Sequence, residues 1–287
     1  MLVAANRCLR LTALLWLVVC GPAWAAAPRN DPSASTIVDG VYENAYFGLR
    51  YPLPPDWTEG IHGPRPSGTG YYVLTTLMPQ GEPTGTILIT AQDMFFATRP
   101  FTDAVAMAAD LSRAAAAIEG MTVDSGTAQI EIAGHVFGTA SFTGAGLHHA
   151  VFVTEIRCHL VSVNLTSRDP VTLAQLVRSL DHLSLGASGA AAKTPICVQN
   201  YANDDTVLRR IEPVATGAPF APVPVRIVIG SDGSVRSTHV IRASDAQRKS
   251  IEDALARWKF RPYEIDDHVA EVETGLRFQP GGERSRD

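Results

Sequence analysis

The sequence has few cysteines, no cluster of basic residues and none of the common catalytic motifs. Four cysteines occur in 287 residues, and 24 Lys and Arg stand against 29 Asp and Glu. Without a patch of basic side chains to neutralise phosphates, nucleic-acid binding is disfavoured. No G-x-S-x-G, H-E-x-x-H, Walker or C-x-x-C pattern is present, so we predict no catalytic residues, no metal and no cofactor. These absences favour a binding protein over an enzyme.

Long apolar runs are also missing, apart from one at the N-terminus. Arg7 and Arg10 precede the apolar stretch Leu11–Val19, and Gly21 and Pro22 then interrupt it. A helix that crosses a membrane needs about 20 apolar residues, and this stretch is shorter. Basic residues followed by a short apolar stretch are typical of a secretory signal peptide. The pattern predicts export to the periplasm and no membrane span after cleavage.

Small residues follow the apolar stretch where signal peptidase requires them. Ala23 and Ala25 occupy the −3 and −1 positions before Ala26, which predicts a signal peptide over residues 1–25. Its removal leaves 22 basic and 29 acidic residues, a net charge of −7. Two alternatives stay open: retention of the segment as an inner-membrane anchor, and lipidation of Cys20, which the valine before it disfavours.

Two cysteines remain after cleavage, Cys158 and Cys197. An even pair in an oxidising compartment favours a disulfide. The alternative is two separate buried thiols, because a free cysteine behaves as a small hydrophobic residue. A bridge across their 39-residue separation stabilises the fold by roughly 3–4 kcal/mol in the chain-entropy model.

A run of small residues divides the mature chain into two domains. Residues 187–194 are mostly small, with four Ala and single Ser and Gly residues, which is typical of a linker. We predict a signal peptide over 1–25, a disordered leader over 26–39, a first domain over 40–186, a linker over 187–194, a second domain over 195–280 and a disordered tail over 281–287.

The first domain alternates strand-like and helix-like segments. Tyr71–Met78 and Thr86–Thr90 are rich in β-branched and aromatic residues, which favours strands. Thr102 is a candidate N-cap for a first helix, and Asp169 for a second helix that opens with a proline. Four strand-like segments lie between the helices. The order predicts an α+β fold, with an antiparallel sheet covered by helices.

Two short motifs near the start of this domain resemble those of PsbP-like proteins. They are Tyr46–Leu49, with the sequence Y-F-G-L, and Pro54–Trp57, with the sequence P-P-D-W. The resemblance implies that residues 40–186 form a PsbP-like α/β/α sandwich.

The sequence of the second domain predicts a small β-β-α-β-β unit. Val223–Ile229 alternates apolar and other residues, Asp232 and Gly233 predict a hairpin turn, and Ser244 caps a helix. Trp258 ends the apolar stripe of that helix and is predicted to be buried. So few strands leave at least one sheet edge open to a partner.

Three segments of this unit resemble the C-terminal domain of TonB-family proteins. They are Val225–Val235 with its D-G-x-V turn, Trp258–Tyr263 with the sequence W-K-F-R-P-Y, and the final strand Val272–Phe278. The resemblance implies a domain that binds a short peptide of an outer-membrane receptor by strand addition. A TonB energy transducer also has an inner-membrane anchor and a long Pro-rich spacer, which this chain lacks if the signal is cleaved. An anchored TonB-like transducer for outer-membrane transport therefore stays an alternative.

The last strand is the predicted binding edge, and its residues are Val269, Glu271, Val272, Glu273 and Arg277. We expect the partner to be an envelope or outer-membrane protein, with a homodimer as an alternative. A periplasmic enzyme of unrecognised type, with a site in the first domain, is the other alternative.

Histidines offer a weaker hypothesis. His148 and His149 fall in a predicted hairpin turn and His159 on a nearby strand, where imidazoles converge on a metal in some proteins. The spacing matches no standard site, so polar turn and strand positions are favoured. Asp266–His268 is likewise predicted to be a turn.

Overall fold

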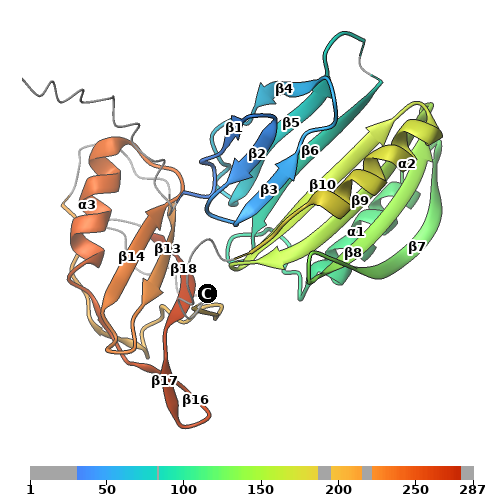
Figure 1. Cartoon of the computed structure of the whole chain (residues 1–287). Helices are drawn as coiled ribbons and strands as arrows, with labels where there is room; N and C mark the ends of the chain where they lie inside the picture. The colour runs from blue at the N-terminus through green and yellow to red at the C-terminus, as the bar shows by residue number, and fades with distance from the viewer. Residues whose placement is uncertain (1–30, 83, 187–194, 215–221, 279–287) are drawn as a thin grey trace, which may run out of the picture.

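The computed structural model describes residues 31–82, 84–186, 195–214 and 222–278. The chain folds into two parts, each with its own sheet and buried apolar core (Figure 1). Helices pack on sheets that are mostly antiparallel, which confirms the α+β class. The predicted signal peptide, linker and tail lie outside the described residues.

The first part is built on an antiparallel sheet of seven strands in the order β4-β5-β6-β10-β9-β8-β7. Consecutive strands are mostly neighbours, because short turns connect them. The strands are β4 (Trp57–His62), β5 (Tyr71–Pro79), β6 (Gly85–Asp93), β7 (Met121–Ile132), β8 (His135–Gly144), β9 (Leu147–Ile156) and β10 (His159–Ser167).

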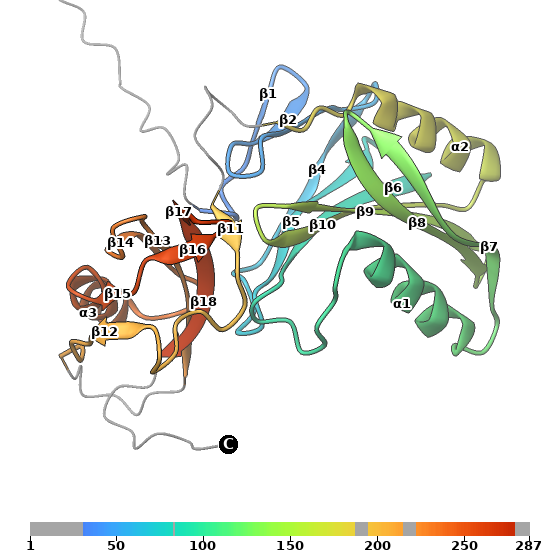
Figure 2. The ribbon, with the colours of Figure 1, turned by 90° about the horizontal axis from the view of Figure 1, so that it is seen from below.

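Two helices cover opposite faces of this sheet (Figure 2). Helix α1 (Ala104–Ala116) begins after Asp103, whose side chain accepts from the Ala106 amide, so the cap lies one residue beyond the predicted Thr102. Helix α2 (Pro170–Ser179) is capped by Asp169, as predicted. A short 3₁₀ helix, η1 (Leu180–His182), follows.

A three-stranded antiparallel sheet lies beside the main sheet. It consists of β1 (Thr36–Val38), β2 (Val41–Asn44) and β3 (Leu49–Pro52). Tyr42 and Tyr51 are buried in the same core as the main sheet. Strand β1 falls within the leader that we predicted to be disordered. The prediction was wrong there because Ile37 packs against this core.

The second part is a four-stranded sheet in the order β11-β18-β13-β14, with α3 (Asp245–Leu255) on one face. The Ser244–Gln247 capping box is present at the start of α3. Strand β11 runs parallel to β18 and the other pairs are antiparallel. The strands are β11 (Ile196–Cys197), β13 (Val223–Ile229), β14 (Val235–Val240) and β18 (Val272–Phe278).

Four short strands complete the second part. Trp258 precedes one of them and is 5 % exposed, as expected for a core residue. Its indole Nε1 donates to the Ile211 carbonyl oxygen over 2.8 Å. The strands are β12 (Val207–Arg209) paired with β15 (Lys259–Phe260), and β16 (Tyr263–Ile265) paired with β17 (His268–Ala270).

Candidate functional site

A disulfide joins the two parts of the molecule. Cys158 lies in the turn between β9 and β10, and Cys197 lies on β11. Their Cα atoms are 5.7 Å apart, within the range that a disulfide requires. The predicted bridge is confirmed, and it holds β11 beside the first part.

A buried arginine also connects the two parts. Arg226, on β13, is 2 % exposed. Its Nη1 lies 2.8 Å from Oδ2 of Asp93, at the end of β6, and its Nη2 lies 2.6 Å from Oε1 of Glu273, on β18. A buried charge is tolerated only when partners surround it, and loss of one partner typically costs about 3–5 kcal/mol. The ion pairs therefore lock Asp93 of the first part to the second part.

His159 completes this buried cluster from β10. Its Nδ1 lies 2.8 Å from the Arg157 carbonyl oxygen, so this nitrogen is the donor and Nε2 accepts from Arg226 Nη1 at 3.0 Å. Burial, and then the Arg226 charge, hold the pKa of His159 well below its usual value. The ring is therefore neutral. Burial raises the pKa of Asp93, while Arg226 and the Phe95 amide lower it.

Aromatic rings enclose His159 on the side of the first part. Tyr46, Phe47 and Tyr72 approach it edge-on, with ring centroids 5.5, 5.1 and 5.8 Å away. The Tyr72 hydroxyl lies 3.4 Å from Nε2 of His239, on β14. Such packing excludes water from the ion pairs, which strengthens them.

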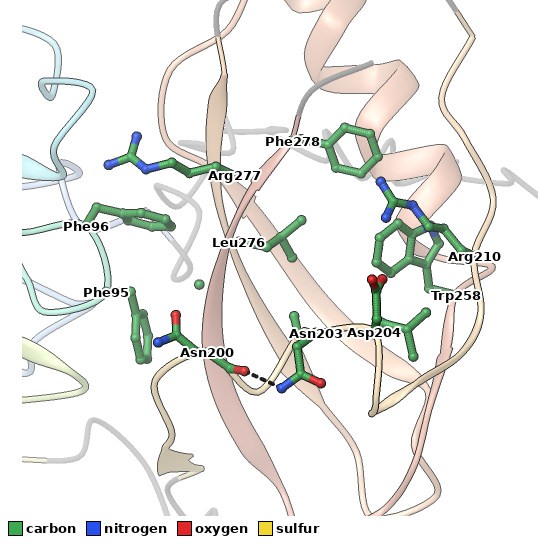
Figure 3. Close-up of a pocket in the computed structure, with 13 residues that line it drawn as sticks. Phe95, Phe96, Asn200, Asn203, Asp204, Arg210, Trp258, Leu276, Arg277 and Phe278 are labelled. Carbon is green, nitrogen blue, oxygen red and sulfur yellow. Dashed lines mark hydrogen bonds between the residues drawn. The ribbon is translucent and has the colours of Figure 1, made fainter. Parts of the chain in front are cut away.

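A pocket of about 350 Å³ opens beside this locked region, between the two parts (Figure 3). Phe95 and Phe96, from the loop after β6, form one wall, and Trp258 lies on the opposite side. The end of β18 runs between them. The volume is within the usual range for ligand pockets, about 300–1,000 Å³.

The pocket exposes an edge of β18 with which no strand pairs among the residues that the structure describes. In β13, the Pro224 carbonyl oxygen accepts from the Ile241 amide and so points toward β14. Because backbone direction alternates, the N–H and C=O groups of Val225 and Ile227 point toward β18. Along β18, backbone direction alternates, so Gly275 and Arg277 point their N–H and C=O groups away from β13. These groups form an open strand edge inside the pocket.

The chain itself keeps this edge open. Strand β11 pairs with β18 only at Val272 and Glu273. Asn200 then has a positive φ of 57°, and its carbonyl oxygen accepts from the Asn203 side chain over 2.8 Å. After this turn the Tyr201 amide donates to the side-chain Oγ1 of Thr274 and not to the β18 backbone, so β11 does not continue along Gly275 and Arg277.

Two arginines lie at the rim of the pocket. The guanidinium of Arg277 lies 5.4 Å from the centre of the Phe96 ring (Figure 3). Arg210 lies 5.2 Å from the Trp258 ring and forms an ion pair with Glu212 at 2.7 Å. Arg210 is therefore neutralised by a neighbour.

The predicted edge residues lie in different environments. Val269 belongs to β17, in a separate two-stranded sheet, and Glu271 precedes β18 and accepts from the Ile196 amide. Val272 and Glu273 are buried, and β11 pairs with them. The prediction of an open edge is corrected at these two positions, because a residue pair from the same chain occupies it. Arg277 is exposed at the pocket.

The histidines are not brought together. His148 and His149 lie within β9, not in the predicted turn, which Ala145 and Gly146 form. His149 contacts Thr166, and His159 lies in the interdomain cluster. In the described part of the chain, no group of three or more His, Cys, Asp or Glu is placed to hold a metal ion.

Sequence patterns did not predict the cluster of Asp93, His159 and Arg226, nor the positions of Phe95 and Phe96. Apolar residues alternate along β13, so Arg226 lies on the face opposite the core of the second part, where a side chain is expected to be exposed to solvent. The sequence feature that indicates a buried ion pair is Arg226 itself, a charged residue in the middle of an otherwise apolar strand.

The fold and the pocket define a two-part α+β protein with an open strand edge between its parts. No family model matches the chain, and no curated protein matches its sequence. The solution structure of cyanobacterial PsbP from Synechocystis sp. PCC 6803 is a weak structural neighbour. It is 13 % identical, has a TM-score of 0.38 and covers 59 % of this chain and 99 % of that chain. Within the described ranges, no helix combines the length and apolarity needed to cross a membrane.

Proposed function

We propose that this chain is an exported envelope protein that binds an extended segment of a partner protein by strand addition at Gly275–Phe278. The observation that carries the proposal is the unpaired edge in the pocket, where Gly275 and Arg277 direct backbone groups away from β13. An added strand satisfies these groups with main-chain hydrogen bonds, which supply affinity, while side-chain pockets supply selectivity.

The resemblance of the second part to TonB-family C-terminal domains supports the same mode of binding. Its strand with an Asp-Gly turn, its helix followed by Trp258–Tyr263 and its final strand occur in the family order. The resemblance implies that an extended peptide binds by adding a strand to the sheet. We therefore propose a TonB C-terminal-like module whose partner is an envelope or outer-membrane protein.

The proposed location is the periplasm. The basic, apolar and small residues of positions 1–25 support export, and the Cys158–Cys197 disulfide fits an oxidising compartment. The N-terminal sequence of the protein isolated from cells tests this step. A mature chain that begins at Ala26 supports it, whereas an intact Met1 or a lipid on Cys20 contradicts it.

Capture of partners from envelope extract by the immobilised full chain tests the binding site. Arg277→Pro removes the N–H that points into the pocket and should abolish capture, because proline cannot donate to an added strand. Arg277→Ala keeps this N–H and should retain capture.

Thr238→Pro is the matched control, because Thr238 points its N–H outward at the opposite edge of the same sheet, on β14. Circular dichroism would establish that each variant is folded. Capture that survives Arg277→Pro but is lost with Thr238→Pro would move the binding site to β14. Capture that survives both would exclude strand addition to this sheet.

A further inference from the structure

We infer that the pocket at the β18 edge selects an extended segment that carries an acidic side chain opposite Arg277. This inference rests on the proposed strand addition and specifies the chemistry of the partner. It comes from the charge that the fold leaves at the open end of β18.

The fold removes the acidic residues from the exposed face of β18. Sequence alternation puts Glu271, Glu273 and Arg277 on one face, a mixture of charges. Glu273 is buried and neutralised by Arg226. Glu271 lies six residues from Arg277, a distance of about 20 Å along a strand. Along the open half of β18 itself, the charged side chain is therefore Arg277, while Asp204 and Arg210 line the pocket from the opposite side, near Trp258.

Arg277 is placed to receive a carboxylate. It is exposed, its Nη1 makes only a long contact of 3.4 Å with the Gly68 carbonyl oxygen, and Phe96 supports its guanidinium. Over the described residues, no carboxylate lies within ion-pair distance of it. In an added strand, the residue opposite Arg277 places its side chain on the same face, and opposite charges in such pairs attract.

The other face of β18 is mostly covered. Leu276 and Phe278 project to that face, where the Phe278 and Trp258 side chains are only 2 % and 5 % exposed. Asp204 and Arg210 line the pocket beside them. The exposed group that distinguishes the open end of β18 is therefore Arg277.

The first part of the molecule supplies the remaining wall. A Cβ atom on Gly275 would lie 2.5 Å from the Cβ of Phe95 and 2.8 Å from Cζ of Phe96, so both rings pack directly against β18 at this point. The site therefore requires both parts of the chain, and the test uses the full chain.

Binding of synthetic peptides, measured by fluorescence anisotropy at low salt, tests the inference. The probes are Ser-Thr-Val-Glu-Val-Thr-Ser, with both ends blocked, and the same peptide with Lys in place of Glu. We expect the Glu peptide to bind roughly fivefold more tightly, the upper range for one cross-strand charge pair. Arg277→Glu should reverse the order of the two peptides.

Arg236→Glu changes the net charge equally on β14, the other edge strand, and should leave the preference for the Glu peptide intact. Equal binding of both peptides, or a preference that persists in Arg277→Glu, would overturn the inference and leave strand addition standing. Failure of both peptides to bind would contradict strand addition itself, and the inference with it.

Discussion

The outer edge of β18 has two halves that lie in different surroundings. At Val272 and Glu273 the edge is closed by β11, and the Cys158–Cys197 disulfide ties β11 to the first part. At Gly275 and Arg277 the edge lies open in a pocket. The two halves belong to one strand and share the same partner, β13, on their other side.

The difference between the halves arises outside β18. Residues 195–198 close the first half, and the buried Arg226 holds Glu273 there. The turn at Asn200 leaves the second half free. The paths of neighbouring segments thus decide which part of a strand edge is open. Variants of the closed half test what keeps it closed.

Replacement of the buried arginine should have the largest effect. Arg226→Ala leaves Asp93 and Glu273 as unpaired buried acids, and we expect the free energy of unfolding to fall by about 3–5 kcal/mol. Denaturant unfolding measures the loss. Arg277→Ala, in the open half, is the control and should cost no more than about 0.5 kcal/mol. Equal losses in the two variants would contradict the assignment of Arg226 as the interdomain lock.

Removal of the disulfide should have a slightly smaller effect on stability and a local effect on β11. The double replacement Cys158→Ala and Cys197→Ala should lower the free energy of unfolding by roughly 3–4 kcal/mol in the chain-entropy model. Strand β11 has two residues, and its flanking backbone hydrogen bonds run from Ile196 to Glu271 and from Val198 to Glu273.

Each such bond contributes only about 0.5–1.5 kcal/mol, so the untethered strand should detach. Hydrogen exchange at the Ile196 and Val198 amides should accelerate in the double variant, while exchange at amides in the core of α3 stays slow. Unchanged protection of both amides would mean that β11 needs no tether.

A fall of one pH unit should have the smallest effect. Burial lowers the pKa of His159 well below its usual value and that of His239 to about 4. As the pH falls through about 6.5, both histidines become protonated in the unfolded state but stay neutral in the folded state. Protonation therefore stabilises the unfolded state, and the free energy of unfolding decreases. We expect a loss of at most about 1.4 kcal/mol per pH unit for each residue. Unfolding at several values from about pH 7 to pH 5 measures the slope.

His239→Asn should reduce this slope, and His268→Asn, at the exposed start of β17, is the matched control. A slope that is equal in all three proteins would exclude His239 as a source of the pH dependence. Loss of stability at low pH is expected to begin in the closed half, because His159 contacts Arg226 there.

Local patterns predicted much of the second part. The hairpin between β13 and β14, the capping box at Ser244 and the buried Trp258 depend on residues close together in the chain. The disulfide also followed from the count of cysteines and the predicted export. Strands β1 and β11 were missed, because a strand of two or three residues carries too little alternation to be recognised.

The open strand edge was predicted only in part. Alternation along Val272–Phe278 identified the strand but not which of its positions another segment covers. Arg277 remains at the open edge, whereas Glu273 is removed from it by an ion pair with Arg226, 47 positions away in sequence. No pattern within the strand contains that information.

The sequence by itself determined the α+β class, the caps of α2 and α3, the turn between β13 and β14 and the pairing of Cys158 with Cys197, because each depends on local propensity or on a small set of candidates. Tertiary structure decided the rest. Arg226 is a core residue only because Asp93, 133 positions earlier, meets it across the domain boundary. A buried charge is stable only when such a partner is present, and the partner's position is a property of the whole fold.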